Sequence, residues 1–197
     1  MSKTDPSAIK KERNRIIRWV ITIFLVTIAV TAIIFTVSEE IMSATTLGAS
    51  FCILLVIVFI GIIFDIVGVA VTSANETPFH SMAARKVPGA KEAIALLRNA
   101  ERVSSICNDV IGDICGVVSG SASANIAAQL LLHFEFSWPA VMGLAMSSIV
   151  SGLTVGGKAI GKTFAVNSST AIVHFVGKTI WFLRSCPISL GKNIKRK

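Results

Sequence analysis

The chain has 197 residues, 53% of them hydrophobic, and a formal net charge of +8 at pH 7. Charged residues make up only 15% of it, whereas a soluble domain carries about 25%. This deficit and several long apolar runs exclude an ordinary soluble domain and indicate an integral membrane protein. Because no polar linker separates the runs, we expect a single membrane domain.

The N-terminal part combines a basic segment with a first apolar run. Residues 1–15 are polar and basic, and we expect them to form a tail at the membrane surface. Residues 16–37 are longer than the apolar region of a signal peptide and end in no clear cleavage site. They are therefore predicted to be a retained first transmembrane helix, followed by a short loop that contains Glu39 and Glu40.

A second apolar run precedes a segment of different character. Residues 45–72 form the second predicted span, which carries a lone carboxylate, Asp65. Residues 76–103 break the apolar pattern and contain two short amphipathic segments separated by Pro88-Gly89. These features predict an amphipathic helical hairpin at the membrane interface.

The C-terminal half contains two further spans. Residues 104–132 form the third, which begins with a polar, small-residue half. Pro139 suits the first turn of the fourth span, residues 140–161. Residues 162–185 form an amphipathic basic segment, predicted to be a juxtamembrane helix, and residues 186–197 form a basic tail.

The basic residues predict the orientation of these spans. All 19 Lys and Arg fall in three regions, with six in residues 1–18, five in 85–102 and eight in 158–197. Four spans place these regions on one side, which the positive-inside rule makes cytoplasmic. The predicted fold is an all-α, multi-pass protein of the cell membrane with four transmembrane helices, a cytoplasmic hairpin and both termini in the cytoplasm. The basic tail is then an anchor to anionic lipid, and no nucleic-acid partner is expected.

Three carboxylates lie at one predicted depth. Asp65 is roughly 10 Å from the cytoplasmic end of its span, and Asp109 and Asp113 are roughly 8 and 13 Å from theirs. An intramembrane carboxylate costs several kcal/mol unless it is protonated, paired or bound to a cation. Oxygen ligands suit a hard cation such as Mg²⁺. The predicted ligands are Asp65, Ser105, Asn108, Asp109, Asp113 and the carbonyl oxygen of Gly157.

A second interpretation remains open. The carboxylates can be protonated or hydrogen-bonded across a helix interface, in which case the chain is a non-transporting scaffold or cation sensor whose polar face is a packing seam. The four cysteines show neither a disulfide framework nor zinc-ligand spacing. No nucleophile–base pair or cofactor motif occurs, so an enzyme is not expected.

Several short motifs carry a family resemblance. They are FDIVGVAVTSAN at 64–75, Gly89-Ala90-Lys91, Glu101-Arg102, Asn108-Asp109 and GGKAIGKTFAVN at 156–167. In order and spacing they resemble the transmembrane domain of the CNNM/CorB/CorC magnesium transporter family over residues 45–185. The resemblance implies a homodimer that binds Mg²⁺ among three helices and moves it by alternating access, with Na⁺ as a candidate coupling ion.

The chain also departs from the family pattern. Asp65 stands where the family has Ser, Gly68 and Lys158 stand where it has Glu, and Gly161 stands where it has Pro. The span at 16–37 is additional. The cytoplasmic CBS-pair domain usual in the family has no counterpart in this sequence, so regulation by ATP is not expected.

Overall fold

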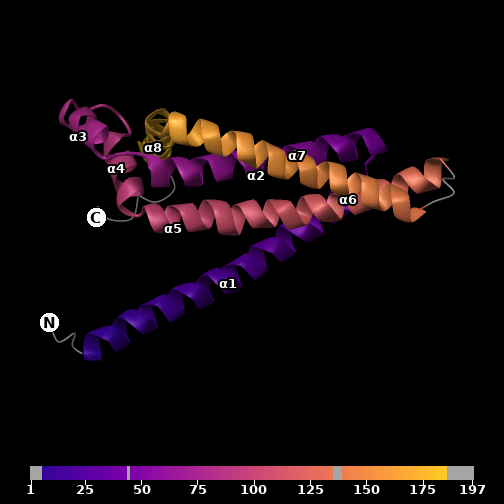
Figure 1. Ribbon diagram of the computed structural model, residues 1–197, viewed down its shortest axis with the longest axis horizontal. Coiled ribbons are helices and arrows are strands. Elements are labelled where there is room, and N and C mark those ends of the chain that lie inside the picture. The colour runs from indigo at the N-terminus through magenta and orange to yellow at the C-terminus, as the bar shows by residue number, and fades with distance from the viewer. Residues whose placement is uncertain (1–5, 44, 135–138, 186–197) are drawn as a thin grey trace, which may run out of the picture. The chain divides into compact units, whose positions relative to one another are not determined.

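The computed structural model describes residues 6–43, 45–134 and 139–185, and the order of their helices can be followed in Figure 1. The elements are α1 (Pro6–Ser43), α2 (Leu47–Ser73), α3 (Thr77–Ala84), α4 (Ala90–Arg98), α5 (Ala100–Ser104), the π-helix η1 (Ser105–Gly112), α6 (Asp113–Phe134), α7 (Pro139–Asn167) and α8 (Ser169–Ser185). No strand occurs in these three ranges. The all-α prediction is therefore confirmed. The predicted tail at 186–197 lies outside the described residues.

Within the described ranges, four helical segments are long and apolar enough to cross a membrane. They are Arg13–Met42, Leu47–Ser73, Ala100–Leu132 and Ala140–Asn167. A helix satisfies all the hydrogen bonds of its backbone internally, which a segment inside a bilayer requires. The four predicted apolar helices are thus present, whereas their orientation remains a prediction.

Several helix ends differ from the predicted boundaries. α1 continues to Ser43, so Glu39 and Glu40, which were predicted to lie in a loop, belong to this helix. α1 begins at Pro6 and includes part of the basic segment assigned to the tail, because Pro suits the first helical turn and Lys, Arg and Glu are good helix formers. α7 continues to Asn167, so the predicted juxtamembrane segment at 162–185 is divided between the end of α7 and α8.

The chain divides into two compact units, which are described separately. The first comprises Met1–Phe59 and Asp113–Gly152, and the second comprises Ile60–Gly112 and Leu153–Lys197. In the first unit α1 packs against α6. Two amides of α6 mark this contact, since Asn125 donates to the Glu39 carboxylate at 3.3 Å and Gln129 donates to the Met42 carbonyl at 3.5 Å.

The second unit has an apolar core that joins the short helices to the long ones. Its buried members are Ala70, Val71, Phe79, Ala93, Leu97, Ala165 and Val173. They come from α2, α3, α4, α7 and α8. Phe79 of α3 is completely buried, so α3 is held to the unit by its single large aromatic side chain.

The backbones of α4 and α8 approach closely at a pair of glycines. Gly89, just before α4, has a φ of 84°, and a Cβ there would collide with the backbone of Lys178 in α8. A Cβ on Gly177 would in turn meet the carbonyl oxygen of Gly89 and the backbone of Ala93. Both positions therefore require glycine, one for its backbone conformation and both for the close approach.

Replacing Gly89 by Ala should destabilise the protein by about 2 kcal/mol or more, because a left-handed conformation costs a side-chain-bearing residue roughly 1–2 kcal/mol before any clash is counted. Thermal unfolding in detergent measures the change. Gly156→Ala is the matched control, since nothing lies within 4 Å of a Cβ at Gly156. Equal midpoints for the two variants would contradict this account of the α4–α8 contact.

Candidate functional site

Asp65 is a buried carboxylate in the middle of an apolar helix. It belongs to α2, in a segment of membrane-spanning length and composition. Only 5% of its surface is exposed, and its Oδ2 is buried without a hydrogen-bond partner. A buried polar atom without a partner costs free energy, so this oxygen is a natural position for a bound ligand.

Asn108 of η1 supplies a second buried oxygen of the same kind. Its Nδ2 donates to the Ser104 hydroxyl at 3.2 Å, while its Oδ1 is buried without a partner. A Cβ added at Gly68 of α2 would collide with this Oδ1, so the carboxamide lies directly on the glycine. Gly68 and Asp65 are three residues apart and share one face of α2. The two partnerless oxygens therefore belong to the same α2–η1 contact.

The π-helix changes which residues of the third apolar segment are buried. π-Helical segments are rare and are found frequently at functional sites. In η1 the buried residues are Cys107, Val110 and Gly112, whereas Asp109 is exposed. Asp109, one of the predicted ligands, therefore does not lie among the buried residues of this helix.

The six predicted ligands do not form one acidic cluster. Asp65 and Asn108 are brought to the same contact, and Ser105 is half-buried one turn from Asn108. Asp109 and Asp113 are exposed, and Asp113 belongs to the first unit. Among the described residues, no group of three or more His, Cys, Asp or Glu is arranged to hold a metal ion.

α7 approaches the same region of α2 through small residues. A Cβ on Gly157 would collide with Ile62, and a Cβ on Gly161 would lie 2.8 Å from Cγ1 of Ile66. Ile62 and Ile66 flank Asp65 in α2 by three residues and one residue. The backbone of Gly157, one of the predicted ligands, is thus held against α2 beside the turn that carries Asp65.

Lys158 brings a positive charge to this junction. It is half-buried, and its Nζ lies 3.5 Å from the position of a Cβ at Gly112, one helical turn from Asn108. It does not pair with Oδ2 of Asp65, because that oxygen has no partner. The sequence showed Lys158 only as a departure from a family pattern, whereas its position makes it a charged neighbour of the candidate site.

Comparison with known proteins gives no match to a protein family, a curated protein or a solved structure. The resemblance to the CNNM/CorB/CorC family stays a prediction from its motifs.

Replacing Gly161 by Ala should destabilise the protein by about 1–3 kcal/mol, the usual cost of inserting a methyl group into a filled contact. Cγ1 of Ile66 is part of a β-branched side chain and has little freedom to move aside. The thermal midpoint in detergent should fall relative to that of Gly156→Ala on the same helix. A midpoint for Gly161→Ala at or above that of the control would contradict the α2–α7 packing.

Proposed function

We propose that this chain transports Mg²⁺ across the cell membrane, binding the ion at Asp65 and Asn108 and working by alternating access as a homodimer. The observation that carries the proposal is the pair of buried, partnerless oxygens, Oδ2 of Asp65 and Oδ1 of Asn108. The homodimer and the alternating access come from the family resemblance and are part of the proposal.

A cation is the ligand that fits these two atoms. An ionised carboxylate and an amide oxygen both act only as acceptors. Inside a bilayer, ionisable groups are usually paired and often mark an ion pathway. A cation bound between α2 and η1 would satisfy both oxygens together and offset the cost of burying the carboxylate.

Mg²⁺ suits a site with few protein ligands. It gives up its water reluctantly and is usually bound through one or two carboxylates while it keeps several waters. One carboxylate, one amide oxygen and the nearby hydroxyls of Ser104 and Ser105 match that pattern. The site would hold a partly hydrated ion and needs no cage of three acids.

The proposed orientation follows from the basic residues. The regions that surround α3, α4 and α8 contain Arg85, Lys86, Lys91, Arg98, Arg102, Lys178 and Arg184. The positive-inside rule places them in the cytoplasm. The Asp65–Asn108 contact then lies in the cytoplasmic half of the membrane. In the proposed mechanism, the structure represents one of the two states of alternating access.

Mg²⁺ should raise the thermal midpoint of the detergent-purified protein by about 5–10 °C at roughly 100 times its dissociation constant, because it binds only the folded state. Ca²⁺, Na⁺ and K⁺ are tested in parallel. The rise should be lost in Asp65→Asn and reduced in Gly68→Ala, whose methyl group would displace the Asn108 carboxamide.

Asp109→Asn is the matched control for that experiment, because it makes the same change at an exposed carboxylate of η1. It should keep the response to Mg²⁺. If Asp109→Asn loses the response and Asp65→Asn keeps it, the assignment of Asp65 as the ligand is wrong. A wild-type protein that responds to no cation would reject the transport proposal.

Replacing Lys158 by Met should tighten Mg²⁺ binding by about tenfold, or about 1.4 kcal/mol. Two positive charges repel each other strongly where the effective dielectric constant is low. Lys162→Met is the control, because Lys162 is exposed one turn further along α7. The measurement is the Mg²⁺ concentration at half of the maximal midpoint shift, and an unchanged value in Lys158→Met would remove Lys158 from the site.

A non-transporting scaffold is the second candidate. The glycine contacts of α7 with Ile62 and Ile66 favour it, since small residues are typical of helix-packing seams in membranes. Asp65→Asn separates the two functions. A seam should keep its stability with the uncharged amide and show no response to cations before or after the change.

A further inference from the structure

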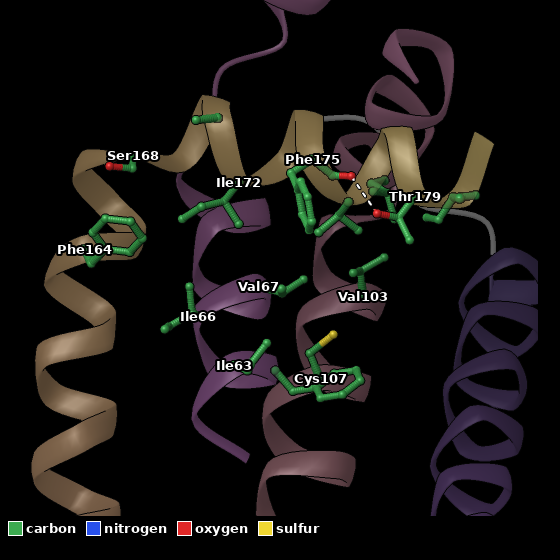
Figure 2. Close-up of a pocket in the computed structure, with 15 residues that line it drawn as sticks. Ile63, Ile66, Val67, Val103, Cys107, Phe164, Ser168, Ile172, Phe175 and Thr179 are labelled. Carbon is green, nitrogen blue, oxygen red and sulfur yellow. Dashed lines mark hydrogen bonds between the residues drawn. The ribbon is translucent and has the colours of Figure 1, made fainter. Parts of the chain in front are cut away.

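A large apolar pocket lies in the second unit, beneath α8. Its volume is about 760 Å³. Figure 2 shows α8 crossing over the ends of neighbouring helices, with Ile172 and Phe175 above Val67, Val103 and Cys107. The pocket is separate from the Asp65–Asn108 contact, because neither residue lines it.

The chemistry of the lining selects an apolar occupant. Among the described residues, no charged side chain lines the pocket, and the polar ones are limited to Cys107, Ser168 and Thr179. The Thr179 hydroxyl already donates to the Phe175 carbonyl at 3.0 Å, as the dashed line in Figure 2 shows. The lining therefore offers an occupant mainly apolar contact.

Seven of the fifteen described lining residues belong to segments of membrane-spanning length and composition, and most of the others belong to α8. Val67 lies in Leu47–Ser73, Val103 in Ala100–Leu132 and Phe164 in Ala140–Asn167. The pocket is open at its side, where Phe164 and Phe175 are 56% and 71% exposed. In a bilayer the exposed ring of Phe164 would contact acyl chains, which would therefore reach the opening of the pocket.

One exposed cation shares a face of α8 with part of the lining. Lys178 is seven residues from Ala171 and three from Phe175, so the three side chains lie on the same side of the helix. Basic residues at a membrane surface attract anionic headgroups, by about 1 kcal/mol each. The volume lies in the range of about 300–1,000 Å³ that holds one small molecule.

We propose that this pocket binds one acyl chain of an anionic phospholipid, whose phosphate lies near Lys178. The lipid would fill the space under α8 and connect α8 to the long helices. This site is independent of Mg²⁺ transport, and its test does not depend on the outcome of the cation experiments.

Native mass spectrometry of the full chain tests the proposal. The protein is incubated with vesicles of equimolar phosphatidylglycerol and phosphatidylcholine, extracted in detergent and washed. The wild type should retain one phosphatidylglycerol per chain. Ala171→Trp and Thr179→Trp each place a large ring at an exposed lining position of α8, and both should lower the retained fraction at least tenfold.

Ala159→Trp is the matched control, because Ala159 is exposed on α7 and does not line the pocket. It should retain lipid as the wild type does. Circular dichroism and the thermal midpoint establish that each variant is folded, and the two α8 positions provide independent tests.

Three results would overturn the proposal. Equal retention in all four proteins would mean that the lipid belongs to the general boundary layer. Equal amounts of phosphatidylcholine and phosphatidylglycerol would reject the anionic headgroup. A dimer that carries no lipid and dissociates only in Ala171→Trp and Thr179→Trp would assign the pocket to a second copy of the chain.

Discussion

A carboxylate inside an apolar helix costs free energy unless something compensates for its charge. Asp65 incurs this cost, because only 5% of its surface is exposed. The surrounding contacts of the second unit bring the Asn108 carboxamide to the same part of α2. Gly68 admits the Asn108 carboxamide, and Gly157 admits α7 beside the same turn. The resulting junction has acceptor oxygens without donors, which is the arrangement a cation would complete.

The second unit also couples this junction to the elements at its end. Ala165 at the end of α7 and Val173 of α8 share one apolar core with Ala70 and Val71 of α2. Gly89 and Gly177 fix α4 against α8 through backbone contact. A movement of α8 would therefore change the packing of α2 and α7, the helices on which the proposed ion site depends.

The apolar helices could be predicted from the sequence because their runs exceed the length that a bilayer requires. The lone carboxylate Asp65 could also be predicted, since it interrupts such a run. The burial of Asn108 against Gly68 could not, because no local pattern encodes a contact between residues forty positions apart. Asp109 was predicted to be a ligand from its depth along the span, but it is exposed on the π-helix η1. Lys158 could not be assigned to the site from the sequence, because its position next to Gly112 depends on the tertiary structure.

Mg²⁺ flux into sealed proteoliposomes, reported by an enclosed Mg²⁺-sensitive dye, tests the central claim most directly. The account predicts that an imposed Mg²⁺ gradient drives uptake through the wild-type protein and that Asp65→Asn reduces uptake to the level of empty liposomes. Asp109→Asn, reconstituted at the same density, should transport as the wild type does. Equal flux through the wild type and Asp65→Asn, or no flux through the wild type, would contradict the account.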